Sequence, residues 1–243
     1  MGERDFSKIR LLEVGSLDVN GTIRGLFAGT NYTGVDLMAG AGVDLVASGH
    51  QLDLPAELFD ITLSCECFEH NPFWIETFEN MCRMTKPGGL IVVTCAARGR
   101  LEHGTKRTSP QTSPGTQAIG IDYYRNLNED DFRAAIPFDS RFQYVRFFQV
   151  PSSFDTYFIG VKAGSSLFSS HYEAVASGVQ AIIDERPSIT LRRVLAVARN
   201  IPISLSRKIL RESSFQTFSV HYIRVIQPLE KFIKSMFRTN SRI

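Results

Sequence analysis

The sequence lacks any apolar run long enough to cross a membrane. A membrane-spanning helix needs roughly 18 or more consecutive apolar residues. The first residues, 1–5, also lack the apolar segment of a secretory signal peptide. Hydrophobic residues make up 43% of the 243 residues and charged residues 21%, which is typical of a soluble globular chain with one sizeable core. We therefore expect a cytoplasmic protein.

Cysteine is also scarce, and its spacing excludes the common zinc motifs. The four cysteines are Cys65, Cys67, Cys82 and Cys95, and none shows the paired Cys-x-x-Cys pattern. We interpret them as reduced, mostly buried thiols without a redox role. The acidic residues likewise show no clear metal-ligand spacing. The sequence therefore predicts no metal site.

What the sequence does contain is an apolar run that ends in an acid and opens into a glycine-bounded loop, residues 10–21. Glu13 ends the run, and Gly15 and Gly21 stand at the two ends of the loop. Ligands of open α/β sheets bind beyond the carboxyl ends of the strands, where glycine lets the backbone approach a ligand closely. The spacing Glu-x-Gly-x5-Gly differs from the Gly-x-Gly-x-x-Gly of dinucleotide-binding proteins.

Further apolar runs end in the same way. Residues 32–37 place Asp36 at a strand end 23 residues after Glu13, where an acid can accept the hydroxyl groups of a ribose. Residues 59–66 and 90–95 predict two more strands. Residues 84–89 between them are typical of a helix end and a turn.

In this order and spacing, the segments 13–15, 35–36, 59–70 and 86–89 resemble class I S-adenosylmethionine-dependent methyltransferases over about residues 10–96. The resemblance implies a Rossmann-like, doubly wound α/β fold and S-adenosylmethionine as cofactor. The first loop departs from the family, with Leu17-Asp18 where a middle glycine is usual. The implied cofactor-binding residues are Glu13, Gly15, Ser16, Gly21, Asp36, Leu37, His50, Cys65, Glu66 and His70.

The rest of the domain can be assigned to further helices and strands from the sequence. We expect a short helix over 22–27, a stub of a strand over 43–46 that follows too closely for a crossover helix, and a helix from Asn71-Pro72. A further helix begins at Asn128. Two final strands, 142–150 and 156–161, form an antiparallel pair beside an otherwise mostly parallel sheet.

Residues 97–127 form a glycine-, proline- and serine-rich segment without periodicity, which we interpret as a substrate or lid loop because it follows a strand end. We assign 1–163 to the methyltransferase domain and 164–243 to a helical extension. The extension is predicted helical over 169–184 and, from 188, as helices broken near Pro202 and Pro228.

The extension is basic and amphipathic. From Leu191 onward there are eleven lysines and arginines but two acids. Its apolar residues need a partner, for which three candidates stay open: the chain's own domain, a second copy in a homodimer, or peripheral contact with an anionic membrane.

Methyl transfer requires an aligned acceptor and removal of its proton. Histidine suits this role near neutral pH. His103, at the start of the loop, is the predicted general base, with Asp122 or Glu66 to orient it; the alternative is a histidine that only contacts substrate. His70 is interpreted as cofactor-site scaffold. Metal-independent transfer is expected.

Residues 122–126 (Asp-Tyr-Tyr-Arg-Asn) combine aromatic faces with polar groups and suit a glycan. The sequence therefore favours O-methylation of a small-molecule or carbohydrate acceptor. A nucleic-acid methyltransferase is disfavoured because no Asn-Pro-Pro-Tyr-type motif is present. A catalytically silent interaction module is disfavoured because Glu13, Gly15 and Asp36 are present. An NAD-dependent enzyme is disfavoured by the spacing of the first loop.

Overall fold

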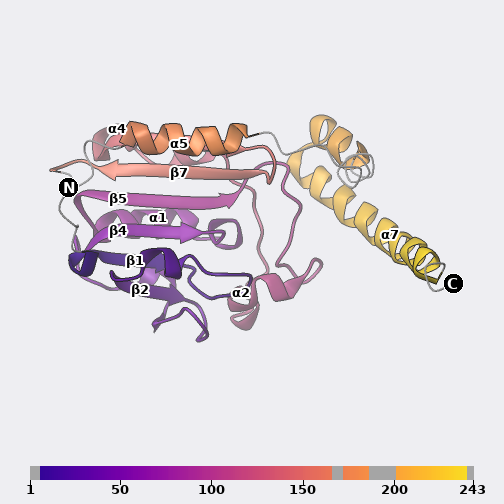
Figure 1. Cartoon of the computed structure of the whole chain (residues 1–243), viewed down its shortest axis with the longest axis horizontal. Coiled ribbons are helices and arrows are strands. Elements are labelled where there is room, and N and C mark those ends of the chain that lie inside the picture. The colour runs from indigo at the N-terminus through magenta and orange to yellow at the C-terminus, as the bar shows by residue number, and fades with distance from the viewer. Residues whose placement is uncertain (1–5, 166–171, 186–200, 240–243) are drawn as a thin grey trace. The chain divides into compact units, whose positions relative to one another are not determined.

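A seven-stranded sheet organises the first part of the chain (Figure 1). The computed structural model describes residues 6–165, 172–185 and 201–239. The strand order is β3-β2-β1-β4-β5-β7-β6. Neighbours from β3 to β5 pair in parallel, while β7 pairs antiparallel with both β5 and β6. The predicted mostly parallel sheet with an antiparallel final pair is confirmed. The strands are β1 Arg10–Val14, β2 Asn31–Asp36, β3 Leu45–Val46, β4 Phe59–Cys65, β5 Thr85–Ala96, β6 Phe142–Val150 and β7 Asp155–Lys162.

Most connections are short helices and single turns. The 3-10 turns are η1 Phe6–Lys8, η2 Arg24–Phe27, η3 Gly49–Gln51, η4 Phe68–His70 and η5 Pro110–Thr112. The labelled α-helices are α1 Trp74–Met84, α2 Pro114–Ala118, α3 Glu129–Ala135, α4 Phe138–Arg141, α5 Tyr172–Asp184 and α7 Glu212–Thr239. Residues 201–209 are also helical. The helix α3 begins as predicted, with Asn128 and Asp131 forming a capping box.

The main core lies on the sheet face that α1 covers. Trp74, Phe78 and Met81 recur at helical spacing on α1 and are buried. They pack with Phe132 of α3 and Phe158 of β7. The ring centroids of Trp74 and Phe132 are 5.0 Å apart, and those of Phe78 and Phe158 are 5.3 Å apart. The apolar stripe of α1 is therefore part of the core.

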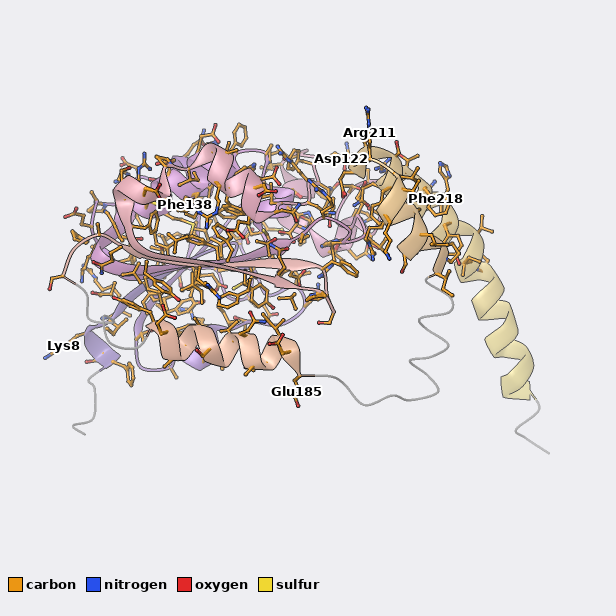
Figure 2. The ribbon with its side chains drawn as sticks, turned by 90° about the horizontal axis from the view of Figure 1, so that it is seen from above. Lys8, Asp122, Phe138, Glu185, Arg211 and Phe218 are labelled. Atoms are coloured by element: carbon orange, nitrogen blue, oxygen red, sulfur yellow. The ribbon has the colours of Figure 1, made fainter. Side chains whose placement is uncertain are left out.

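The helix α5 covers the opposite face at the antiparallel edge. Tyr172 of α5 stacks on Tyr144 of β6 with ring centroids 5.1 Å apart. Because successive strand residues face opposite sides, Val145 and Phe147 turn instead toward the main core. Figure 2 shows Phe138 on one side of the sheet and α5, which ends just before Glu185, on the other.

Two local predictions need correction. The helix expected over 22–27 is only the 3-10 turn η2, because Gly25 and Gly29 weaken helical continuation and the chain enters β2 at Asn31. Met84 ends α1 as expected, but the turn expected after it, residues 85–89, is part of β5. There Gly88 adopts a φ of 73°, and the pairing with β4 is irregular between Thr85 and Leu90. The strand stub is confirmed, since β3 has two residues.

The chain divides into two compact units, residues 1–185 and 186–243. The helix α5 therefore lies in the first unit and not in an extension that begins at residue 164. The helix α7 continues through Pro228, so the predicted break there is wrong. A proline inside a helix removes one hydrogen bond and crowds the preceding turn, yet α7 continues on both sides of Pro228. Pro202 lies within the described helical residues 201–209, while the prediction for 188–200 falls outside the described residues. Within the described part, no helix combines the length and apolarity that a bilayer crossing requires.

Candidate functional site

The candidate site lies at the carboxyl ends of β1, β2, β4 and β5. The strand order reverses between β1 and β4, because the chain passes from β1 to β2 on one side and returns to β4 on the other. Ligands of open α/β sheets bind at such a switch point. Figure 1 shows the segment 97–127, including α2, extending from this edge of the sheet.

The first loop turns sharply at Gly15. Gly15 has a φ of 86°, and a Cβ there would lie 2.5 Å from the Cβ of Cys67. Both conditions select glycine. The N–H groups of Gly15 and Ser16 donate to the Val35 carbonyl at 2.8 and 3.1 Å. The hydroxyl of Ser16 is buried without a hydrogen-bond partner among the described residues.

The other loop glycine, Gly21, serves the turn rather than a close approach. Its φ is 125°, and a Cβ added there would meet no atom within 4 Å. Its N–H donates to the carboxylate of Asp18 at 2.9 Å. The departure from the family at Leu17-Asp18 therefore has a local structural role, because Asp18 closes this turn.

Asp36 ends β2 and is fixed by backbone donors. One carboxylate oxygen accepts the N–H of Leu17 at 3.1 Å, and the other accepts the N–H of Leu37 at 2.7 Å. Burial raises the pKa of Asp36, while these donors act in the opposite direction. A Cβ on Gly115 of α2 would lie 2.7 Å from Asp36 Oδ1. The segment 97–127 therefore reaches the carboxylate that the resemblance assigns to ribose.

Glu13 is buried one strand away and is engaged within the sheet. Its carboxylate accepts a hydrogen bond from the Tyr32 hydroxyl of β2. Burial raises the pKa of Glu13. The guanidinium of Arg24 lies 4.8 Å from the Tyr32 ring centroid and pairs with Asp44 at 3.0 Å. Glu13 therefore joins β1 to β2 through its side chain.

Two further predicted site residues lie beside the carboxyl ends of the strands: His50 in the turn η3, and Glu66 directly after β4. His50 stacks on Phe73 at 4.2 Å, and its Nδ1 lies 2.7 Å from the Ser48 hydroxyl. Glu66 adopts a φ of 52°, which is strained for a residue other than glycine. Its carboxylate accepts from Thr94 at 3.0 Å. Burial raises the pKa of the neighbouring Cys65 thiol to about 12, so the thiol stays protonated near neutral pH.

His70 and His103 come together with Tyr124 although they lie far apart in the sequence. The ring centroids of the two histidines are 4.9 Å apart, and that of Tyr124 lies 5.5 Å from His70 and 5.0 Å from His103. Burial lowers the pKa of His70 to about 3, and burial also lowers the pKa of His103. Both imidazoles are therefore neutral near pH 7.

The backbone, not an acid, orients His103. Its Nδ1 donates to the Leu101 carbonyl at 3.0 Å, which leaves Nε2 with a lone pair. The expectation that Asp122 or Glu66 orients His103 is wrong. Asp122 instead accepts the N–H of Lys106 at 2.8 Å, and Glu66 pairs with Thr94 and, at 3.8 Å, with Arg100.

Sequence reasoning gave no role of its own to Glu69, which adjoins this cluster and precedes His70 in the segment 59–70. Its side chain is fully buried at 0% exposure. Burial, together with the nearby Glu66 carboxylate, raises the pKa of Glu69 well above the usual range. Glutamate is seldom fully buried without a partner. The sequence therefore gave no reason to expect a buried Glu69, apart from its position after a strand end.

The segment 97–127 is tied to itself and to the ends of β4 and β5. Leu127 N–H donates to the Ala96 carbonyl at 2.8 Å, and Arg125 N–H donates to the Glu69 carbonyl at 2.8 Å. The Gln117 side chain donates to the Gly104 carbonyl at 2.9 Å. Of the predicted glycan-facing residues 122–126, Tyr124 faces the histidines, whereas the Arg125 side chain pairs with Asp131 at 2.7 Å.

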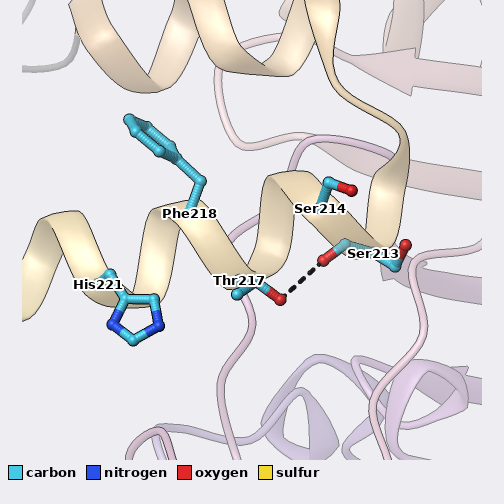
Figure 3. A pocket seen from close by; sticks show the side chains of 5 residues that line it. All are labelled: Ser213, Ser214, Thr217, Phe218 and His221. Carbon is cyan, nitrogen blue, oxygen red and sulfur yellow. Dashed lines mark hydrogen bonds between the residues drawn. The ribbon is translucent and has the colours of Figure 1, made fainter.

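A separate open hollow of about 460 Å³ lies on α7 (Figure 3). Its lining comes from one helix, and Thr217 there donates to the Ser213 carbonyl at 3.0 Å. It contains none of the residues at the strand edge and is therefore not the candidate site. The lining residues are Ser213, Ser214, Thr217, Phe218 and His221.

Comparison with known proteins identifies the domain that carries this edge. Residues 12–93 match the family model described as a methyltransferase domain. A comparison with curated proteins finds no match. Among solved structures, the chain is similar to phosphoethanolamine N-methyltransferase 2 of Haemonchus contortus bound to phosphomonomethylethanolamine and S-adenosylhomocysteine, with 15% identity and a TM-score of 0.46. The match covers 64% of this chain and 49% of that chain, so this chain spans about half of that length.

Two further structures are similar at the same level. One is 1,6-didemethyltoxoflavin-N1-methyltransferase of Burkholderia thailandensis, with 14% identity, a TM-score of 0.42, and coverage of 65% of this chain and 73% of that chain. The other is the CurJ carbon methyltransferase, with 16% identity and a TM-score of 0.44. That match covers 65% of this chain and 49% of that chain. At these values the likenesses do not bear on the acceptor.

The family match spans the residues that build the switch point, from β1 through the first nine residues of β5. It includes Gly15, Asp36 and the turn η4, so the family model and the observed edge describe the same part of the chain. Residues 12–93 of the chain therefore form a methyltransferase domain, in agreement with the resemblance to class I S-adenosylmethionine-dependent methyltransferases.

Proposed function

We propose that this enzyme transfers the methyl group to a hydroxyl oxygen of a small-molecule or carbohydrate acceptor, with His103 as general base. The observation that carries the proposal is the hydrogen bond from His103 Nδ1 to the Leu101 carbonyl. It fixes the tautomer in which Nε2 can accept a proton. The burial of the ring keeps it neutral near pH 7, as a base requires.

The cofactor half of the site is proposed to lie at β1 and β2. S-adenosylmethionine, when bound, supplies an activated methyl group on sulfur. Asp36 would accept hydrogen bonds from ribose hydroxyls, and Ser16, whose hydroxyl has no hydrogen-bond partner among the described residues, would contribute a further one. Leu37 lies beside Asp36, and His50, stacked on Phe73, offers a flat surface on the flank of the edge.

The acceptor is proposed to lie against His70, His103 and Tyr124. In the transfer, the acceptor oxygen would form a bond to the methyl carbon as the bond from that carbon to sulfur breaks. His103 Nε2 would take the hydroxyl proton, and the segment 97–127 would exclude water. The grouped rings of these three residues offer flat faces on which a sugar could stack, which supports a carbohydrate or another small cyclic acceptor.

A partner for the C-terminal unit is also part of this proposal. Its described residues include Leu205, Ile209 and Val225, which expose 55%, 78% and 71% of their surface. Basic residues such as Arg211 and Arg224 lie in the same unit. A second copy of the chain or an anionic membrane fits this composition. Sedimentation with anionic vesicles that is reversed by salt would support the membrane, while a concentration-dependent dimer would support the second copy.

The test of the proposed function has two stages. Calorimetric titration with S-adenosylhomocysteine should show one site per chain, and NAD should give no comparable heat. Release of S-adenosylhomocysteine is then measured against matched panels of hydroxyl, amine and carbon acceptors. Turnover confined to amine or carbon acceptors would overturn O-methylation while leaving cofactor binding intact.

A further inference from the structure

Three ligand-type side chains meet where the turn η4 faces the start of the segment 97–127. Glu69, His70 and His103 each offer one ligand atom, and these atoms all lie within 4.8 Å of one another. Two come from adjacent positions after β4, and the third comes from a segment that begins beyond β5. The folded chain, not local sequence, brings them together.

Glu69 and His70 contribute buried polar atoms that have no hydrogen-bond partner among the described residues. Glu69 is 0% exposed, and neither of its carboxyl oxygens has a hydrogen-bond partner among the described residues. The Nδ1 of His70, a residue that is 6% exposed, is also without one. About nine in ten or more of the buried polar groups in folded proteins are hydrogen-bonded. Neighbouring orphaned atoms therefore point to a ligand.

His103 is already oriented as a metal-binding histidine would be. Its Nδ1 donates to the Leu101 carbonyl at 3.0 Å, leaving Nε2 to bind. Metal-bound histidines usually donate their other ring N–H to a carbonyl or carboxylate, which fixes the tautomer and the direction of the ring.

The backbone at Gly104 packs closely against the His70 ring. A Cβ at this position would lie 2.6 Å from Cε1 and 3.0 Å from Nδ1 of His70. The backbone of Glu69 is held as well, because its carbonyl accepts the N–H of Arg125 at 2.8 Å. The ligand groups are thus supported by contacts outside the cluster.

We propose that Glu69, His70 and His103 bind a divalent transition-metal ion of the Zn²⁺ class. Two imidazoles and one carboxylate suit zinc and its first-row neighbours, whereas Mg²⁺ and Ca²⁺ prefer oxygen ligands alone. Three protein ligands leave a coordination position open, as in catalytic zinc sites. The proposal departs from the sequence-based expectation of no metal site.

Metal binding and proton removal use the same nitrogen of His103. An ion on Nε2 therefore excludes the general-base role while it is bound. The two proposals are separable, because metal binding is measured without cofactor or acceptor. Loss of one does not entail loss of the other.

The experiment uses the full chain after dialysis against a chelator. Co²⁺ is titrated while its visible d–d absorption is recorded, and Zn²⁺ is then added as competitor. One Co²⁺ per chain, with an absorption band that Zn²⁺ removes, is the expected result. Absence of saturable binding would overturn the proposal.

Variants locate the site. His103→Ala and Glu69→Gln should each weaken Co²⁺ binding by at least about tenfold, the lower end of the change expected even for supporting residues. His221→Ala, in α7, is the matched control and should bind as the parent does. Because Glu69 is buried and its variant could fold poorly, His103→Ala on the partly exposed segment provides the second test. Equal Co²⁺ affinity in His103→Ala and His221→Ala would place the ion elsewhere and overturn the assignment.

Discussion

The two halves of the candidate site, at the carboxyl ends of the strands, are stabilised by different kinds of contact. The cofactor half, residues 14–17 and 35–37, is fixed by backbone N–H groups that donate to the Val35 carbonyl and to the Asp36 carboxylate. The acceptor half, residues 65–70 and 97–127, depends on side chains such as His70, His103 and Tyr124. Its contacts join parts of the chain that are far apart.

In the proposed function, this difference would separate binding of a common cofactor from recognition of a particular acceptor. Backbone donors keep their positions when neighbouring side chains change, so the cofactor half can stay the same while the acceptor half varies. Loops on a rigid scaffold are where such specificity usually resides. The halves meet where Gly115 approaches Asp36. Substitutions in each half should therefore have distinct effects.

The largest effect is expected from His103→Ala in the acceptor half. Loss of a general base lowers turnover by about 10²- to 10⁴-fold. Affinity for S-adenosylhomocysteine should change little, because His103 is not part of the cofactor half. Turnover is measured with an acceptor found in the panel above, and His221→Ala serves as control. Near-parental turnover would show that another group accepts the proton.

Asp36→Ala should break the cofactor half instead. Hydrogen bonds to a charged group contribute roughly 1.5–3 kcal/mol each, so affinity for S-adenosylhomocysteine should fall by roughly 10- to 150-fold per bond lost. Calorimetry on Asp36→Ala and on Asp130→Ala, an exposed acid of α3, makes the comparison. If both variants bind alike, Asp36 does not contact the cofactor.

Tyr32→Phe tests the hydrogen bond between the side chains of Tyr32 and Glu13, which joins β2 to β1 next to the cofactor half. It removes the hydroxyl that donates to Glu13 and leaves a buried acceptor unsatisfied, at a cost of about 1–3 kcal/mol. Burial already raises the pKa of Glu13 above its ordinary value, and loss of the donor raises it further. A raised folded-state pKa favours the folded state at low pH and disfavours it once the pH passes that pKa. The stability deficit of the variant should therefore grow as pH rises through the raised pKa, and should be larger at pH 8 than at pH 5.

Urea unfolding of Tyr32→Phe and of the parent at both pH values measures this deficit. The comparison is made between the two chains at each pH, so that the titration of other groups cancels. A deficit that is larger at pH 5 contradicts the assignment of the hydrogen bond to the Glu13 carboxylate.

Gly115→Ala should have the smallest effect, at the contact between the halves. The added Cβ would lie 2.7 Å from Asp36 Oδ1, so α2 must move away from that carboxylate. We expect cleavage within 97–127 by a protease to become a few-fold faster in the ligand-free protein. Gly25→Ala, where no atom lies within 4 Å of the new Cβ, is the control. Equal cleavage of the two variants would show that this contact does not hold the segment.

The strand edge was predictable because its signals are local. An apolar run followed by an acid or glycine marks Gly15 and Asp36 without knowledge of the fold. The antiparallel final pair was equally visible, since its strands are joined by a short turn. These features depend on residues that are close in the sequence, where period and turn chemistry apply directly.

The acceptor half was less predictable because its partners are distant. Nothing near Asp122 indicates that it accepts the N–H of Lys106, 16 residues away. Glu69 received no role of its own from the sequence, because a carboxylate next to a histidine is ordinarily exposed. The helix break predicted at Pro228 is wrong for the opposite reason. Proline ends helices by a local rule, but the long helix α7 continues through it.

The hydrogen bond from Leu127 to Ala96 has a consequence for how such an enzyme could be retargeted. It brings the two ends of the intervening segment side by side at the end of β5. The entropy of closing a loop rises slowly with length, by about 0.6 kcal/mol for each doubling. A segment of different length and composition could therefore be grafted between these two residues with little change in the stability of the sheet. The part of the proposed acceptor half that this segment contributes could then be exchanged, while residues 14–17 and 35–37 stay unchanged.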